Sequence, residues 1–320
     1  MNGSGFILSN SEAARLIEAD QANEQVVRQY LTGQDLVTSP QQKASRFIVN
    51  FENLTMDAAS RFRLPFDLVR ERVKPVRDTL PDYKRRVRDG WWQYEFTARE
   101  LYGRVAALER CLGISRVGKA VMPVFTTTDV TFSDAVVVFA YDDDFHFGVL
   151  SSAFHWWWTV KYASTMRADI RYTPTDVFET FPQPEFTGPV REAGRALDAH
   201  RHDLIARRDE GVTRIYNRFH EPAEQAVDIQ ELRRLHVALD TAVADAYGWR
   251  DLDLDHGFHE TRLGMRFTVG PQAQAEILDR LLELNHARYA REQSEQATGA
   301  KPVRKRARSA PGQTSMLGEG

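Results

Sequence analysis

The sequence predicts an α+β protein with a mixed domain over residues 1–186, an all-α domain over 187–293 and a basic, disordered tail over 294–320. Up to about residue 186, short runs rich in Val, Phe and Thr alternate with segments of helical spacing. Charged segments with helical spacing follow one another after that point. The last residues are first basic and then rich in small residues and Gly, a composition typical of disorder.

The N-terminal segment predicts a helix followed by a strand. In "SNSEAARLI", Ser9 or Asn10 is a suitable N-cap, and the apolar residues after it recur at helical spacing. "SRFIVNF", residues 45–51, is a run of residues that favour β structure, so it predicts a strand.

The next segment predicts several short helices and one longer one. Thr55 is a suitable N-cap, and Pro65 and Pro75 divide the helical pattern that follows into short pieces. "TARELYGRVAALERCLG" has an amphipathic pattern, which predicts a helix over residues 97–112 that ends at Gly113.

Residues 114–150 are dense in Val, Phe and Thr and predict β structure. The "YDDD" segment at 141–144 is typical of a solvated hairpin turn, with a divalent-ion site as the alternative. "SAFHWWWTVKYAS", residues 152–164, fits either a helix or a strand, and a proline-rich segment follows it.

The C-terminal half predicts helices. Leu232, Leu235, His236 and Leu239 recur at the i, i+3, i+4, i+7 spacing of one helix face, and Asp228 is a suitable N-cap for this helix.

Composition favours an intracellular protein. The single cysteine excludes an internal disulfide, no apolar stretch approaches the ~18 residues of a membrane-spanning helix, and the N-terminus lacks the pattern of a signal peptide. We therefore expect a cytoplasmic protein with no membrane partner.

Sequence motifs give no catalytic, cofactor or metal site. Cys111 lies in the predicted helix and is expected to be a small buried residue. "DLDLDHGFH", residues 251–259, lacks the Gly and terminal Glu of a calcium loop and predicts a connecting loop. No Gly-rich turn follows a strand as nucleotide-binding loops do. These absences favour a recognition or interaction module.

Two patterns suggest contact with DNA. Arg167, Asp169 and Arg171 alternate with uncharged residues, so a strand would place them on one face. Arg can donate two hydrogen bonds to guanine and Asp can accept one from cytosine, although a simple solvated strand face has the same pattern.

The second pattern is a basic segment. Between Arg61 and Arg88 there are ten Lys or Arg residues and four acids, a balance of +6 in a chain whose net charge is −3. Such side chains can bind DNA phosphates. The candidate phosphate contacts are Lys74, Arg77, Lys84, Arg85, Arg86 and Arg88.

Segments in serial order resemble MmeI-like (type IIL) restriction–methyltransferases. "GFILSNSEAARLIEAD", "VVRQYLTGQDL", "RFIVNF" and "WWQYEFTARELY" are similar to the start of the target-recognition domain of that family, and "VVVFAYDDDFHFGVLSSAFHWWW" and "IRYTPTDVFETFPQPE" to its end. "GVTRIYN", "DIQELRRLHVALDTAVADAYGW" and "ILDRLLELNHARY" are similar to the helical C-terminal domain. The resemblance covers roughly residues 3–290.

The resemblance implies a target-recognition domain over 1–186 and a helical C-terminal domain over 187–293. Family members carry a nuclease and a SAM-dependent adenine-N6 methyltransferase before these domains, and the recognition domain selects the site for both. The implied base-reading residues are Arg167, Asp169 and Arg171, which precede Tyr172 and the "FPQP" exit.

Met1 falls near the expected end of the methyltransferase domain, so SAM and the catalytic motifs are expected on a separate polypeptide, with or without a nuclease. The expected function is recognition of double-stranded DNA for that methyltransferase in a restriction–modification or phage-defence system. A specificity polypeptide of another defence system, a truncated relic, a protein-interaction scaffold and a single-strand or RNA binder remain alternatives.

Residues 155–158, "HWWW", are expected to support the charged strand. One or two of the three tryptophans are expected in the core, and the third on DNA or on a partner. His155 fits a buried, hydrogen-bonded role better than a phosphate contact.

Overall fold

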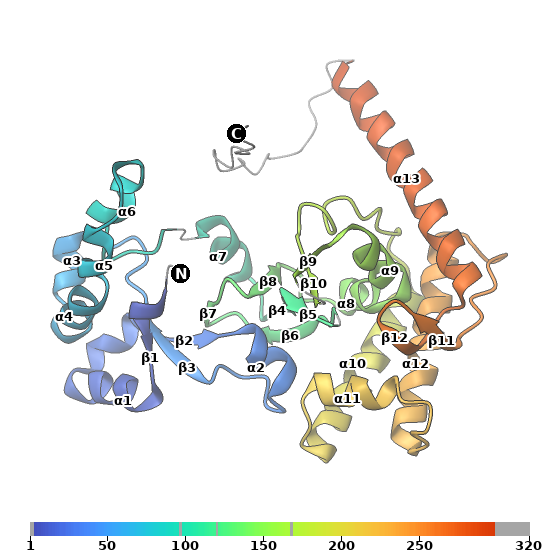
Figure 1. The fold of residues 1–320 in the computed structure, drawn as a ribbon, viewed down its shortest axis with the longest axis horizontal. Helices are drawn as coiled ribbons and strands as arrows, with labels where there is room; N and C mark the ends of the chain where they lie inside the picture. Colours follow the sequence, from blue (N-terminus) through green and yellow to red (C-terminus); the bar gives the residue numbers. More distant parts are fainter. Residues whose placement is uncertain (1–2, 96–97, 120, 167–168, 298–320) are drawn as a thin grey trace, which may run out of the picture.

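The protein is described from a computed structural model, which covers residues 3–95, 98–119, 121–166 and 169–297. The N-terminal and C-terminal segments lie at opposite ends of the long axis, with the strands and helices of residues 110–171 between them (Figure 1). The predicted α+β class is confirmed.

The N-terminal sheet has four strands in the order β1-β3-β2-β7: β1 Ile7–Leu8, β3 Arg46–Val49, β2 Val27–Leu31 and β7 Thr131–Phe132. Strand β7 is parallel to β2, and the other pairs are antiparallel. Helix α1, Asn10–Ala19, begins as predicted after Ser9, whose hydroxyl accepts from Glu12 N while the Glu12 carboxylate accepts from Ser9 N.

Short helices follow this sheet: α3 Met56–Ser60, α4 Arg63–Arg72, α5 Lys74–Asp78, α6 Arg85–Asp89 and α7 Arg99–Val105. Thr55 caps α3 as predicted. Pro65 and Pro75 lie in the first turns of α4 and α5, where a missing backbone N–H costs nothing. Phe6, Val49, Phe66 and other apolar side chains form a small core of residues 6–91.

The helix predicted over 97–112 is wrong in its second half. Helix α7 ends at Val105, and Arg110–Ser115 forms strand β4. This strand lies between β6, Val124–Thr127, and β8, Val136–Phe139. Its residues 111–114 are all buried, and a strand covered on both faces has no polar alternation to distinguish it from a helix.

Cys111 is buried as predicted, but in this central strand rather than in a helix. Burial raises the pKa of its thiol to about 12, so it stays protonated and unreactive at neutral pH.

Two consecutive helices follow β8. The predicted hairpin turn at 141–144 instead leads into α8, Asp144–Ser151, where the Asp143 carboxylate accepts from His146 N as an N-cap. The ambiguous segment 152–164 forms helix α9, Ala153–Tyr162, capped by Ser152.

The C-terminal region is mainly helical, with α10 Gly188–Arg208, α11 Val212–Phe219, α12 Val227–Ala246 and α13 Pro271–Ala297. It also contains a hairpin that the all-α prediction lacked, β11 Gly257–Thr261 and β12 Gly264–Thr268. Gly264 has φ +92° in its turn, a conformation that favours glycine. Helix α13 continues through residues 294–297 of the predicted tail, and the remainder of that tail lies outside the described residues.

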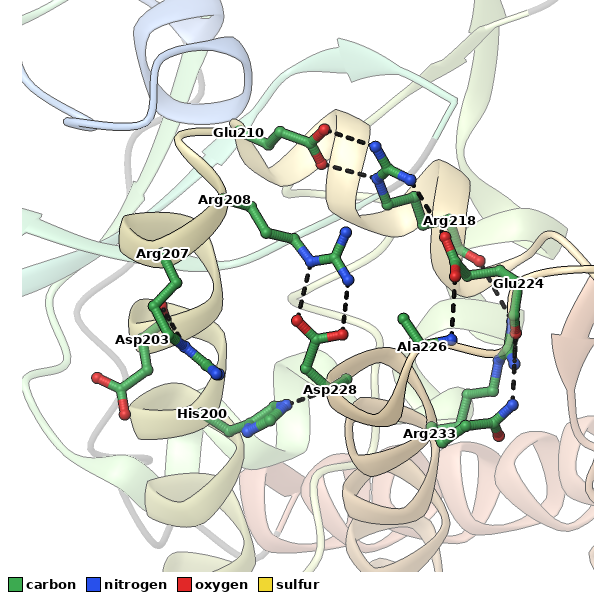
Figure 2. Close-up of polar contacts among 11 residues, drawn as sticks. His200, Asp203, Arg207, Arg208, Glu210, Arg218, Glu224, Ala226, Asp228 and Arg233 are labelled. Atoms are coloured by element: carbon green, nitrogen blue, oxygen red, sulfur yellow. Dashed lines mark hydrogen bonds and ion pairs between the residues drawn. The ribbon is translucent and has the colours of Figure 1, made fainter.

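Arg233 of α12 holds the turn after α11. Its guanidinium is nearly fully buried and donates to the carbonyls of Arg218, Phe219, Glu221 and Glu224. Figure 2 shows Arg233 beside Glu224. Arg218 and Phe219 are the last two residues of α11, and Glu221 and Glu224 lie just beyond it, where the helix offers these carbonyls no further N–H.

Asp228 does not cap α12 as predicted, because that helix begins at Val227 with Ala226 as its cap residue. The Asp228 carboxylate instead accepts two hydrogen bonds from Arg208, at 2.9 and 2.6 Å, and so joins α12 to α10 (Figure 2). Arg208 holds the pKa of Asp228 below its ordinary value.

One large core extends across the domain boundary predicted at 186/187. It contains Phe147, Leu150 and Trp158 together with Val190 and Leu239. Helices α8 and α10 approach closely through Gly148 and Gly194, since a Cβ on Gly194 would overlap the carbonyl of Asp144. The mixed region after residue 105 and the helical region therefore contribute side chains to one common hydrophobic core.

Candidate nucleic-acid interface

The predicted charged strand lies in the middle of a small three-stranded sheet, β5-β10-β9. Strand β10, Asp169–Arg171, pairs antiparallel with β9, Ser164–Met166, and with β5, Val117–Gly118. Arg167 and Ala168 lie outside the described residues, so the structure gives no position for the predicted contact of Arg167.

The two faces of β10 differ as a strand alternation requires. Ile170 and Tyr172 are 2% and 1% exposed and point into the core, whereas Asp169 is half-buried and Arg171 is exposed. Asp169 and Arg171 therefore lie on the outer face of the sheet, as the spacing predicted. Ser164 of β9 is paired with Arg171 in the sheet and is also exposed.

A buried pair of side chains fixes the end of β10. The Tyr172 hydroxyl lies 3.0 Å from His155 Nε2, and His155 Nδ1 lies 3.0 Å from the Leu150 carbonyl. A carbonyl only accepts, so Nδ1 donates and Nε2 accepts the tyrosine proton. Burial lowers the pKa of His155 to about 4, which keeps the ring neutral in this role. The buried, hydrogen-bonded role predicted for His155 is confirmed.

Two of the three tryptophans lie in the core, as expected, and the contact of the third with DNA or with a partner stays a prediction. Trp157 and Trp158 are each 2% exposed, and Trp158 Nε1 donates to the Val177 carbonyl and to Thr180 Oγ1, both at 3.2 Å. Trp156 is only partly buried, and the Arg266 guanidinium lies 5.8 Å from its ring centre. The large core thus supports the inner face of the three-stranded sheet.

Arg77 is not available for the predicted phosphate contact. Its side chain is buried, and its guanidinium donates to the carbonyls of Gly90, Trp91 and Gln93. Burial lowers its pKa. A phosphate could reach it only if these bonds were broken, so we assign Arg77 to the fold of the α5–α6 segment.

The other predicted phosphate contacts lie at the surface, and four of the five form ion pairs. Lys74 pairs with Asp78 at 2.6 Å, Lys84 with Glu95 at 3.6 Å, Arg85 with Asp89 at 3.1 Å and Arg88 with Asp82 at 3.1 Å. Arg86 is exposed and forms no ion pair with the described residues. Exposed ion pairs contribute only ~0–1 kcal/mol, so phosphates can compete for these cations.

Tyr83 is an exposed residue of this segment that the sequence analysis did not single out. Its side chain is 85% exposed, between Asp82 and Lys84. An aromatic residue inside a basic run was the available signal, because such side chains are suited to contact nucleic acid.

A cavity of about 70 Å³ lies where α9, α11, α12 and the C-terminal hairpin meet. Asp240 is its best-connected polar group: its carboxylate accepts from Ala153 N at 2.7 Å and lies 2.9 Å from His256 Nε2. Tyr216 and His236 form a second pair at 2.8 Å. These contacts join α12 to the start of α9, to α11 and to the residue just before the hairpin.

The described ranges contain neither a metal-site cluster nor a membrane-spanning helix. No group of three His, Cys, Asp or Glu side chains there has the arrangement of a metal site. None of the helices in those ranges is both long and apolar enough to cross a bilayer.

Comparison with known proteins places this geometry in context. Residues 1–185 match the family model described as MmeI, target recognition domain. The chain is also similar to the solved structure of the type IIL restriction–modification enzyme MmeI in complex with DNA, with a TM-score of 0.68 and 17% identity. That match covers 89% of this chain and 34% of the solved enzyme, so the chain spans about a third of its length. No curated protein matches.

Proposed function

Because this chain belongs to the MmeI target recognition domain family, we propose that it recognises a specific sequence in double-stranded DNA. It would direct a SAM-dependent adenine-N6 methyltransferase to that site in a restriction–modification or phage-defence system. The observation that carries the proposal is the outer face of β10, where Asp169 and Arg171 lie on the same side of a strand whose other side packs on the large core.

Base reading requires donors and acceptors held in a fixed register. Arg171 can donate two parallel hydrogen bonds to guanine O6 and N7, and Asp169 can accept one from cytosine N4. We assign the same base-reading role to Arg167 from the sequence pattern alone. Each such contact discriminates against the wrong base by ~1–3 kcal/mol.

Phosphate contacts supply the sequence-independent part of the affinity. We propose Lys74, Lys84, Arg85, Arg86 and Arg88 for this role. Arg86 is the strongest candidate, since its charge is not already compensated by a described carboxylate.

Methyl transfer would need SAM and an active site that takes the adenine out of the base stack. We assign both to a methyltransferase outside the residues of this chain, on a separate polypeptide, with or without a nuclease. The role of this chain is to bring that active site to the selected sequence.

Selection from random duplex DNA tests the proposal. The purified chain is incubated at about 150 mM salt, with and without the product of the adjacent upstream gene. A single enriched motif supports sequence recognition and shows whether the partner is required.

Absence of enrichment in both conditions, with weak binding that disappears at that salt concentration, would contradict the proposal. It would favour a protein-interaction scaffold or a relic instead. Preference for unpaired strands would favour a single-strand or RNA binder.

A further inference from the structure

Strand β5 brings residues from a distant part of the sequence to the outer face that carries Asp169 and Arg171. The register pairs Arg171 with Val117 and Ile170 with Gly118. Continuing it by one residue places Lys119 opposite Asp169. About fifty residues separate these two positions in the chain, so only the sheet makes them neighbours.

The alternation of faces gives the direction of Lys119. Gly118 pairs with Ile170, whose side chain is buried, so Gly118 belongs to the inner face. The residues on either side of it, Val117 and Lys119, belong to the outer face. Lys119 is exposed, in agreement with this assignment.

The charge of Lys119 is available to a ligand. No carboxylate of the described residues forms an ion pair with its ammonium group, although the register, continued by one residue, places Asp169 opposite it. Such a group is a hydrogen-bond donor without an acceptor, and the carbonyl oxygen and ring nitrogen of guanine are acceptors suited to Lys.

The backbone at Lys119 is held from the C-terminal hairpin. Arg266, on β12, donates to the Lys119 carbonyl at 3.4 Å, and its guanidinium lies above Trp156. The end of β5 is therefore tied to the large core, as the end of β10 is through Tyr172.

We propose that Lys119 is a further specificity-determining residue, which donates to the acceptor edge of a guanine next to the base pair contacted by Asp169. This inference rests on the proposed function. It extends the base-reading face beyond β10, with Lys119 directly after β5 and with Asp169 and Arg171 on β10.

The test compares Lys119→Ala, Arg171→Ala and Lys43→Ala with the unchanged chain in the selection from random duplex DNA, with the upstream partner present. Lys43 is an exposed lysine in the loop between α2, Gly33–Thr38, and β3, so it controls for loss of one positive charge. Thermal unfolding of each variant verifies that the fold is retained.

The expected result for Lys119→Ala is loss of preference at one position of the motif, different from the position relaxed by Arg171→Ala. Affinity for the selected site should fall about fivefold or more, with little change on unrelated DNA. Lys43→Ala should keep the motif unchanged.

Two results would overturn the inference alone. One is a uniform loss of affinity for all sequences, which would make Lys119 a phosphate contact. The other is a Lys119→Ala motif identical to that of Lys43→Ala while Arg171→Ala still alters it. If the unchanged chain selects no motif, the proposed function itself fails.

Discussion

The two regions assigned to DNA differ in how their side chains are held. The sheet β5-β10-β9 packs its inner face on the large core, and the end of β10 is fixed by Tyr172 and His155. The basic α4–α6 segment packs on the smaller core, and most of its cations are exposed in surface ion pairs. Base reading requires fixed geometry, whereas phosphate attraction requires mainly charge. The difference in packing therefore matches the difference in proposed role.

The largest difference between the two cores should appear in how their stability depends on pH. Burial lowers the pKa of His155 and His236 to about 4 from 6.5, so the unfolded chain binds more protons between these values. The stability of the large core should be complete above about pH 6.5 and fall as pH decreases toward 4. Residues 1–95 contain no histidine.

In the small core the corresponding group is Glu12, whose pKa is lowered to about 2 by hydrogen bonds from Arg72 and Ser9. Its contribution is present above pH 4.5 and lost as pH falls toward 2. Hydrogen exchange of both regions between pH 7 and pH 3 should show the large core opening first. If both cores opened at the same pH, the predicted difference in their acid stability would be wrong.

The second largest effect should come from removing a large core side chain beneath the base-reading sheet. Trp158→Ala should lower the free energy of unfolding by ~3–5 kcal/mol, because Trp158 is 2% exposed and fills the core. Denaturant unfolding measures this loss. The control is Trp156→Ala, at a partly buried position, and an equal loss there would show that the core does not carry the support.

Arg171→Ala should act on specificity without affecting the fold, since Arg171 is exposed. We expect a loss of ~1–3 kcal/mol on the selected DNA site and relaxed choice at one base pair. Binding titrations on the selected and scrambled duplexes measure both. Equal weakening on the two duplexes would make Arg171 a phosphate contact.

Tyr172→Phe should have a smaller effect, on the positioning of β10. The change removes the hydroxyl that donates to His155 Nε2 and leaves that buried acceptor unpaired, at a cost of ~1–3 kcal/mol in stability. The selected motif should be kept but with weaker discrimination. An unchanged degree of discrimination would show that this bond does not position the reading face.

Arg86→Ala should have the smallest effect on DNA affinity, and this effect should not depend on the DNA sequence. Loss of one phosphate contact should weaken binding to all duplexes alike and reduce the slope of log affinity against log salt by ~0.9. Arg77→Ala provides the contrast, because its buried hydrogen bonds predict loss of stability rather than of salt dependence. A sequence-dependent effect of Arg86→Ala would contradict its assignment.

Local signals in the sequence predicted much of the fold. Ser9 and Thr55 identified helix starts because an N-cap needs only a neighbouring hydroxyl. Strand β4 was missed because residues on both of its faces are buried, as at Cys111, Leu112 and Ile114, so the segment lacks the alternation of a half-buried strand. The C-terminal hairpin was missed because its two strands have only five residues each and show no regular alternation of buried and exposed side chains.

The candidate site was predictable only along one strand. The spacing of Asp169 and Arg171 placed both on one face, and the structure agrees. That Lys119 and Ser164 share this face depends on the pairing of separate strands, for which the sequence contains no local signal. The burial of Arg77 depended likewise on carbonyls at residues 90–93, which the basic pattern could not reveal.

Disulfide crosslinking to DNA tests the central claim most directly. Cys111 is the only cysteine and is fully buried, so Arg171→Cys introduces a single accessible thiol. The DNA carries a thiol tether on one cytosine N4 in the major groove, moved position by position through the selected site. We expect one position to crosslink efficiently with Arg171→Cys, and none to do so with Arg86→Cys. Crosslinking from Arg86→Cys but not from Arg171→Cys would contradict the assignment of the three-stranded sheet as the surface that reads bases.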